Sequence, residues 1–171
     1  MSSNEKFNTF LQIAKELNAI NIIPLLMGSV GLEIVTKRSW DASDLDIHVP
    51  GDRRGWEAPA ETALHNWQDI KSIMEQLGYE LIDLHEHEFR KNDLSVEFGI
   101  IDTLPDFAGI QISELEVHST EDINYYLLSV EQYLAVYRAS SKDSYRAENN
   151  NFKDLEKIGY LKELAVSSNE L

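Results

Sequence analysis

The chain has 171 residues, 43% of them hydrophobic and 26% charged, which is typical of one folded globular domain. It contains no cysteine, so disulfides, thiolate chemistry and cysteine-ligated metal sites are excluded. Thirty acidic residues against fifteen basic ones give a net charge of −15, and such a surface repels phosphate backbones, so we expect no general nucleic-acid binding. The first residues lack the apolar core of a signal peptide and no apolar run reaches membrane-spanning length, so we expect a cytoplasmic protein without a membrane partner.

The amino-terminal segments carry two helical patterns and two strand patterns. Apolar residues at helical spacing predict a first helix over residues 4–17. A short apolar run over residues 22–27 precedes a Gly-Ser pair and a helical pattern over residues 30–36, which predicts a strand, a tight turn and a helix. Residues 44–49 alternate polar with apolar and end at a Pro-Gly turn, which predicts a second strand.

The middle of the chain predicts one long helix and a hairpin. Apolar residues recur at helical intervals over residues 60–77, and a glycine follows as a suitable helix end. Residues 79–84 and 94–101 have strand patterns, with the turn of a hairpin expected at residues 91–93. A mixed sheet with flanking helices follows from this alternation.

The C-terminal third predicts a helical tail. Residues 115–118 add a last strand, and the stretch that follows has helical periodicity to about residue 139. Within it, Ser129 and Gln132 form a capping box that would divide the stretch into two helices, and residues 152–164 form a further one. The prediction is therefore an α+β fold with a sheet-containing core over residues 1–118. A helical region over residues 119–171 packs on that core as part of a single unit.

Three carboxylates stand out among the strand patterns. Asp44 and Asp46 are separated by one residue, so the period of two turns both carboxylates to one face of the strand, while the apolar residues that alternate with them face the core. Glu97 lies on a later strand whose apolar residues share the opposite face, and a lone carboxylate there is costly to bury unless it is paired or metal-bound. Hard oxygen ligands on neighbouring strands favour Mg²⁺, and two ions about 4 Å apart need a third carboxylate of this kind.

Gly28 and Ser29 add a phosphate site to this pattern. Gly28 has no side chain to block the approach of a phosphate, and Ser29 offers a hydroxyl and a backbone amide at the start of a predicted helix. The pair is therefore a candidate cradle for a nucleoside triphosphate.

In this order the residues resemble the DNA polymerase β-like nucleotidyltransferases, in particular the small stand-alone bacterial type. Those proteins have a strand ending in Gly-Ser, then an Asp-x-Asp strand, then a third acidic residue on a later strand. The resemblance covers residues 22–101. It implies a nucleotidyltransferase-like sheet, with Gly28 and Ser29 on the phosphates, Asp44 and Asp46 on two Mg²⁺ ions, and Glu97 as third ligand or hydroxyl-activating base.

The resemblance also implies an activity and a role for the helical tail. The expected reaction is transfer of a nucleoside monophosphate, AMP from ATP, to a hydroxyl of a small molecule or protein. In the stand-alone members a basic residue of the tail lies near the triphosphate, and the candidates in this chain are Arg138, Lys142, Arg146 and Lys153.

Other interpretations remain beside this one. The chain could be a catalytically silent nucleotidyltransferase-like module that binds a protein partner, of the antitoxin or regulatory type. His48 shares the face of the two aspartates and could touch phosphate or acceptor, while Trp40 and Trp56 could line an acceptor or base pocket. His85 and His87 are interpreted as part of an exposed strand end without a ligand role. The sequence identifies neither the acceptor nor the oligomeric state.

Overall fold

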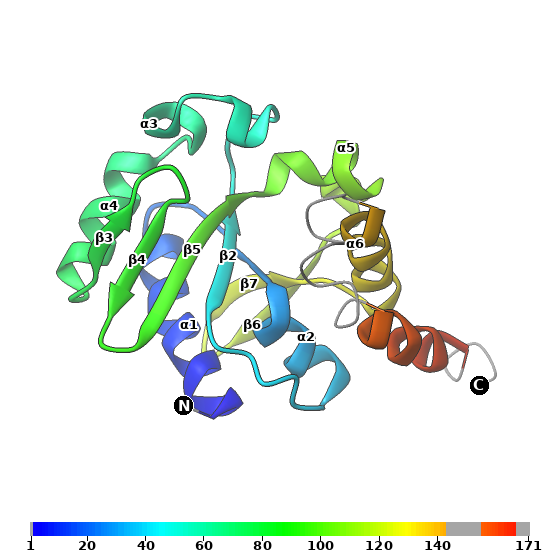
Figure 1. Ribbon diagram of the computed structural model, residues 1–171. Helices are drawn as coiled ribbons and strands as arrows, with labels where there is room; N and C mark the ends of the chain where they lie inside the picture. Colours follow the sequence, from blue (N-terminus) through cyan, green and yellow to red (C-terminus); the bar gives the residue numbers. More distant parts are fainter. Residues whose placement is uncertain (1, 143–154, 167–171) are drawn as a thin grey trace.

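The computed structural model describes residues 2–142 and 155–166, which form an α+β fold built on one mixed sheet (Figure 1). The seven strands of this sheet run in the order β3-β4-β5-β2-β1-β7-β6. Their bounds are β1 Leu25–Met27, β2 Leu45–Val49, β3 Glu80–Asp83, β4 Glu88–Lys91, β5 Leu94–Ile100, β6 Glu116–Thr120 and β7 Ile123–Leu127. This is a mixed sheet as predicted, and β6 overlaps the last strand expected at residues 115–118. Only β7 comes from the region that was expected to be helical.

Helices flank both faces of this sheet. They are α1 Ser3–Ala19, α2 Gly28–Thr36, α3 Ala60–Ala63, α4 Trp67–Gln76, α5 Leu104–Ala108 and α6 Val130–Lys142, followed by a helix over residues 155–166. Short 3-10 turns lie at Gly55–Glu57, Ile101–Thr103 and Ile112–Glu114. No helix in the described ranges combines the length and apolar character needed to cross a membrane.

The middle of the sheet is formed by β1, β2 and β5. β2 pairs in parallel with β5, whereas β1 pairs antiparallel with β2 and parallel with β7. Alternation along β2 is regular, because every second residue is fully buried and the residues between them are partly exposed. The sheet thus presents one apolar face and, at β2 and β5, one polar face.

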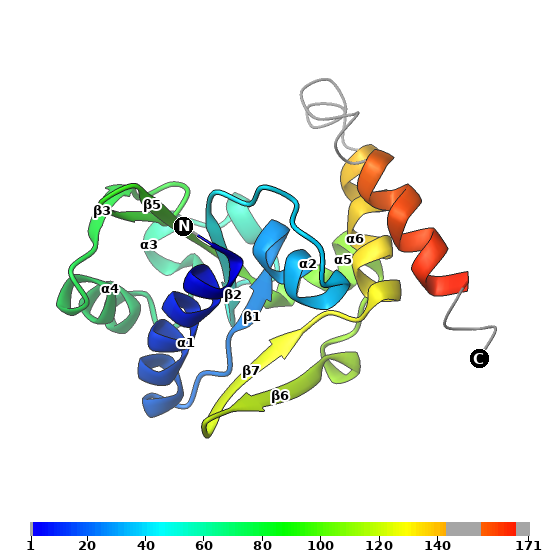
Figure 2. The ribbon, with the colours of Figure 1, turned by 90° about the horizontal axis from the view of Figure 1, so that it is seen from below.

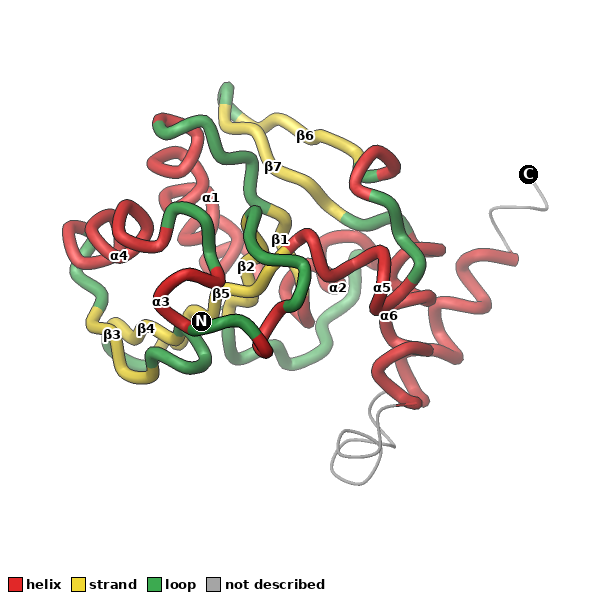
Figure 3. Tube along the Cα trace, turned by 90° about the horizontal axis from the view of Figure 1, so that it is seen from above, coloured by secondary structure: helices red, strands yellow, loops and turns green. Residues whose placement is uncertain are grey.

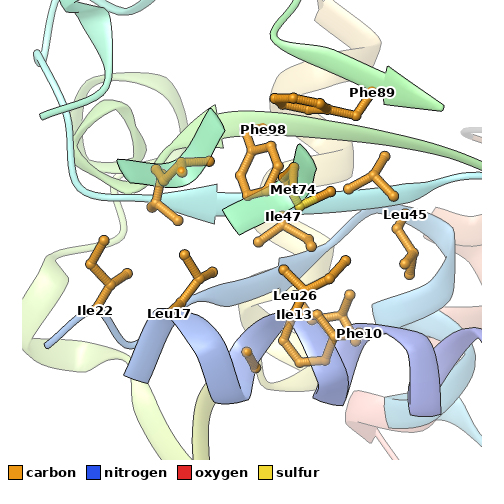
Figure 4. Packing of buried hydrophobic residues seen from close by; sticks show 14 of the residues in the cluster. Phe10, Ile13, Leu17, Ile22, Leu26, Leu45, Ile47, Met74, Phe89 and Phe98 are labelled. Atoms are coloured by element: carbon orange, nitrogen blue, oxygen red, sulfur yellow. The ribbon is translucent and has the colours of Figure 1, made fainter. Parts of the chain in front are cut away.

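The apolar face of the sheet packs against α1 and α4, which lie side by side on this side of the molecule (Figure 3). Phe10 and Ile13 of α1 meet Leu26 and Ile47 of the sheet in a fully buried cluster (Figure 4). The apolar residues at helical spacing on α1 therefore pack against every second residue of the strands. This contact is the physical basis of the helical and the alternating sequence patterns.

A second core lies on the other face of the sheet. Leu25 and Met27 of β1 point into it, opposite to Leu26, and they meet apolar residues of α2, α5, α6 and the helix over residues 155–166. That last helix lies beside α6 in Figure 2, and its Lys157 ammonium is 5.0 Å from the ring centre of Tyr137 on α6. The two helices cover β1 and leave the neighbouring polar face of β2 and β5 uncovered by this core.

Two expectations about secondary structure are wrong. The helix expected over residues 60–77 is divided, because Leu64 has extended backbone and forms a β-bridge with Gly51. The backbone amides of Asp52 and His65 extend this pairing, with bonds of 2.8 Å to Ala63 and 3.3 Å to Pro50. The backbone of residues 50–52 therefore pairs with the backbone N–H and C=O groups of residues 63–65, which a continuous helix would use for its own hydrogen bonds.

The second error concerns the region after residue 118, where a hairpin replaces the expected helix. β6 and β7 pair antiparallel around Glu121 and Asp122, whose φ angles of 52° and 67° are those of a type I′ turn. The helical region begins only at α6, where the predicted capping box is present. Gln132 N–H donates to the Ser129 hydroxyl at 3.1 Å, and Ser129 N–H donates to the Gln132 side chain at 2.9 Å.

Candidate active site

Asp46 and Glu97 lie side by side on the polar face of the sheet. They are register partners on the parallel strands β2 and β5, and their apolar neighbours fill the core on the opposite face. Glu88 of β4 is the register partner of Glu97 on its other side, and its carboxylate accepts a hydrogen bond from Ser95. Three strands thus bring three carboxylates into one row.

This row raises the pKa of Glu97 from 4.5 to about 7. Burial of the carboxyl is the largest cause, and the negative charges of Asp46 and Glu88 follow. Asp44 adds a smaller contribution of the same sign. Repulsion of this kind is relieved when a cation binds between the carboxylates.

Gly28 is in contact with this row. It follows Met27, the register partner of Asp46, and has a φ of 66° that L side chains rarely adopt. A Cβ at this position would lie 3.0 Å from the Asp46 Cβ, so the glycine allows the turn to pass directly beside the carboxylate. The sequence prediction that the Gly-Ser turn and the Asp-x-Asp strand are neighbours agrees with this contact.

The turn leads into α2, and a lysine from the helix over residues 155–166 contacts the first turn of α2. No side chain caps the amino terminus of α2 at Met27, so its first backbone N–H groups have no capping partner from that residue. The Lys157 ammonium donates to the Ser29 hydroxyl at 3.1 Å and lies 5.0 Å from the ring centre of Tyr137. A helix amino terminus with an adjacent ammonium is suited to bind phosphate oxygens.

Asp44 lies exposed just before β2, at the end of a loop that is held at two points. The buried Glu33 carboxylate accepts from the backbone amides of Trp40 and Ala42, at 2.6 and 3.3 Å. The buried Lys6 ammonium donates to the Ala42 carbonyl. These bonds fix the path of the chain into the Asp-x-Asp strand.

The three predicted metal ligands are neighbours but do not form a preformed metal cage. Within residues 2–142 and 155–166, no group of three or more His, Asp or Glu side chains is arranged to hold a metal ion. Asp46 and Glu97 fit a divalent cation by chemistry and by position, because their oxygens are hard ligands and their charges repel. Asp44 lies two residues before Asp46 on the chain, and its side chain is exposed.

His48 extends the site along β2. Its Nε2 lies 3.2 Å from Oδ1 of Asp46, and its ring lies directly over Gly99, where a Cβ would collide with the imidazole. Its Nδ1 atom is buried and has no hydrogen-bond partner among the residues that the structure describes. His48 therefore contacts the carboxylate row, as its place on the strand predicted. It also lines a hollow that lies beyond this row toward the end of β2.

The two tryptophans have different surroundings. Trp40 packs edge-on against Tyr160, lies under the Arg38 guanidinium, and donates through its indole nitrogen to Thr36 at 3.1 Å. It belongs to the contact between the loop and the helix over residues 155–166. Trp56 is exposed and lines the hollow next to His48.

His87 corrects another expectation, since it is buried rather than part of an exposed strand end. Its Nε2 lies 2.7 Å from the Ala60 carbonyl oxygen, and its ring meets Trp67 edge-on. His85 is exposed, as expected.

Lys157 is the functional candidate that the sequence analysis missed. Arg138 is exposed on α6, the side chain of Lys142 lies outside the described part of the chain, and Arg146 and Lys153 lie outside the described residues. Arg138 and Lys142 as nucleotide ligands stay predictions. The signal for Lys157 was its place beside Ile158 in a helical pattern, which puts a lysine at the edge of a buried face.

Comparison with known sequences finds a relative that matches nearly the whole chain. No protein-family model matches the chain. The chain is 36% identical over 159 residues to the uncharacterized protein YnaI of Bacillus subtilis (strain 168), which covers 92% of this chain and 96% of YnaI.

Two solved structures share the fold. An antigenic nucleotidyltransferase-like protein from Paracoccidioides brasiliensis superposes with a TM-score of 0.59 at 18% identity, over 96% of this chain and 78% of the other. The antibiotic-resistance factor ANT(2'')-Ia superposes with a TM-score of 0.54 at 12% identity, over 99% of this chain and 97% of the other. At such identities the likeness concerns the fold alone. The chain therefore has a nucleotidyltransferase-like fold and belongs to the same family as Bacillus subtilis YnaI.

Proposed function

We propose that this protein transfers a nucleoside monophosphate, AMP from ATP, to a hydroxyl group of an acceptor molecule. The observation that carries the proposal is the arrangement on one sheet face of Asp46, Glu97 and the Gly28 turn, with Lys157 on Ser29. Carboxylates for cations and a cationic helix start for phosphates are the two parts that this chemistry needs.

The residues of the chain have distinct parts in the proposed reaction. The start of α2, Ser29 and Lys157 hold the β- and γ-phosphates. The acceptor oxygen attacks the α-phosphorus, the new P–O bond forms as the bond to the bridging oxygen breaks, and pyrophosphate leaves. Glu97 helps to lower the pKa of the acceptor hydroxyl, and its carboxylate accepts the hydroxyl proton.

The proposed cofactor is Mg²⁺, two ions held by Asp44, Asp46 and Glu97. Bound there, magnesium supplies positive charge for the attacking and leaving oxygens. The repulsion that raises the pKa of Glu97 supports this proposal, because carboxylates that repel one another together attract a divalent ion.

Ligand-dependent melting tests the proposal. MgATP should raise the melting temperature of the native protein by mass action, and Asp46→Asn should abolish that gain while the unliganded protein stays folded. Asp93→Asn is the matched control, because Asp93 is an exposed residue of the β4–β5 turn and its variant should keep the full shift. Each triphosphate should be measured with magnesium and with a chelator.

The same measurement separates this function from that of a silent module. A module that only binds a protein partner should show no magnesium-dependent shift with any triphosphate at millimolar concentration. That result would remove the basis of the transferase proposal.

A further inference from the structure

A hollow of about 520 Å³ continues the proposed active site along the sheet. Its lining includes His48 and Gly99, which follow Asp46 and Glu97 by two positions on their strands. At the rise of an extended strand, the hollow begins about 7 Å from the carboxylates. Its size is within the range of pockets that hold small molecules.

The register of β1 and β2 places this hollow on the far side of the carboxylates from the phosphate site. Met27 lies opposite Asp46, and β1 runs antiparallel to β2, so the chain enters the Ser29 turn at the beginning of β2. The hollow lies toward the end of β2, at His48. An in-line displacement needs the attacking oxygen on one side of the phosphorus and the leaving pyrophosphate on the other.

Two exposed aromatic rings line the hollow. The side chains of Trp56 and Phe107 are 79% and 46% exposed, and both belong to its lining. Within the described residues, every other phenylalanine and tryptophan is at least partly buried. Large apolar rings that gather in one concave surface are suited to pack against a ring of a ligand.

The ionised lining of the hollow differs from the surface as a whole. The lining contains two arginines, Arg53 and Arg54, and two acidic residues, Glu86 and Asp106. Its formal charge is therefore zero, in a chain whose net charge is −15. Such a lining lacks the excess of carboxylates that a polycationic acceptor would require.

The two arginines are held very differently. Arg54 makes three bonds of 2.7 to 3.1 Å to the Asp52 carboxylate, which fix its guanidinium. Arg53 reaches Asp106 at 3.2 and 3.4 Å, and both side chains are mostly exposed. An exposed pair of this kind adds little to stability, so the Arg53 guanidinium is free to exchange Asp106 for an anionic group of a ligand.

We propose that this hollow binds the acceptor, and that the acceptor is a small hydroxylated molecule with a ring and an anionic group. The ring packs against Trp56 and Phe107, Arg53 binds the carboxylate or phosphate, and the hydroxyl points toward Glu97. This assignment rests on the proposed function.

Three probes with the same phenol ring and different charge test the inference: 4-hydroxyphenylacetate, tyrosol and tyramine. Binding to the full chain is followed by backbone and indole NMR shifts, with Trp56 and Gly99 as reporters. We expect the anionic probe to bind about fivefold more tightly than the cationic one, as for an exposed charge pair. Arg53→Gln should lower the affinity for the anionic probe to that for tyrosol, and it should leave the affinity for tyrosol unchanged. Arg38→Gln is the matched control, because Arg38 lies on Trp40 and Glu156, outside the hollow.

Each other outcome overturns the assignment. Equal affinity of the three probes, absence of binding up to their solubility, or shifts confined to another surface would show that the hollow does not select such an acceptor. Shifts of Trp56 caused by MgATP itself would make the hollow a nucleoside site. MgATP shifts at Gly28 and Ser29 test the proposed function separately, so a failure of the transferase proposal is recognised independently of the probes.

Discussion

At the scale of single residues, the structure separates what charge patterns could predict from what they could not. Asp46 and Glu97 were predictable, because strand alternation turns a carboxylate to the polar face whatever the details of packing. Lys157 was not, since its contact with Ser29 joins residues 128 positions apart through the docking of one helix. Glu88 was missed because its strand begins beside the turn of residues 84–87 and shows little alternation before it.

Glu97 should make stability depend on pH in a direction opposite to that of most carboxylates. Its pKa is raised to about 7 in the folded protein, so the unfolded chain loses this proton first as the pH rises above 4.5. The carboxyl therefore destabilises the fold progressively between pH 4.5 and 7, and above that range the full penalty remains.

The variant Glu97→Gln tests this dependence. In metal-free buffer we expect it to raise the melting temperature at pH 8 and to have almost no effect near pH 4.5. Thermal unfolding followed by circular dichroism across this range measures the difference. A variant that melts lower than the wild type at pH 8 would contradict the repulsion inferred for the carboxylate row.

Lys157→Met should weaken MgATP binding by roughly tenfold, which corresponds to about 1.4 kcal/mol for one charge-assisted hydrogen bond. Lys162→Met, an exposed position on the same helix, should leave the affinity unchanged. Isothermal titration gives both affinities, and the melting temperature without ligand shows whether the helix is still docked. Equal losses in the two variants would indicate a general charge effect in place of the contact with Ser29.

At the scale of elements, turn residues and apolar periodicity predicted a helix or strand correctly where the segment is determined by its own sequence. The hairpin β4–β5 turns at Asn92, which has a φ of 54°, and α2 follows its strand directly, as predicted. β7 was mistaken for a helix because Tyr125, Leu128 and nearby apolar residues satisfy both periods. Its partner β1 lies about a hundred residues away, so the choice is made by tertiary pairing.

Two glycine substitutions should have opposite signs. Gly28→Ala places a Cβ at a φ of 66° and 3.0 Å from the Asp46 Cβ, so we expect a loss of about 1–2 kcal/mol. Gly159→Ala lies inside the helix over residues 155–166 with nothing within 4 Å of the new Cβ, so we expect a gain of up to about 1 kcal/mol.

Urea denaturation of both variants measures these changes. Tolerance of Gly28→Ala without loss of stability would mean that the turn can move away from β2, and the close approach of the turn to Asp46 would no longer hold.

At the scale of the whole molecule, the helix over residues 155–166 connects stability to the site. Leu161 is fully buried in the second core, and Lys157 is one turn away on the same helix. The sheet brings the carboxylates together without this helix, whereas the cation on the phosphate side depends on its docking.

Leu161→Ala should therefore lower the free energy of unfolding by about 2–4 kcal/mol, as for other buried leucines, and also weaken MgATP binding. Leu155→Ala, at a side chain that is 51% exposed, should change stability by no more than about 0.5 kcal/mol and leave affinity intact. Urea unfolding and nucleotide titration of the same samples check the pair. Unchanged affinity in a destabilised Leu161→Ala protein would show that the helix stabilises the fold without contributing to the site.

The insertion of β7 beside β1 also determines when a newly made chain can become stable. Asn124 exchanges backbone hydrogen bonds of 2.8 and 3.0 Å with the side chain of Asn18, and Tyr125 meets Phe7 and Phe10 with ring centres 5.6 Å apart. Until residue 127 has left the ribosome, α1 lacks one wall of its core and β1 has an unpaired edge that can recruit other chains. Contacts this distant in sequence form slowly. We therefore expect a nascent chain that ends before residue 127 to lack a stable fold, although its two carboxylate strands have already been made.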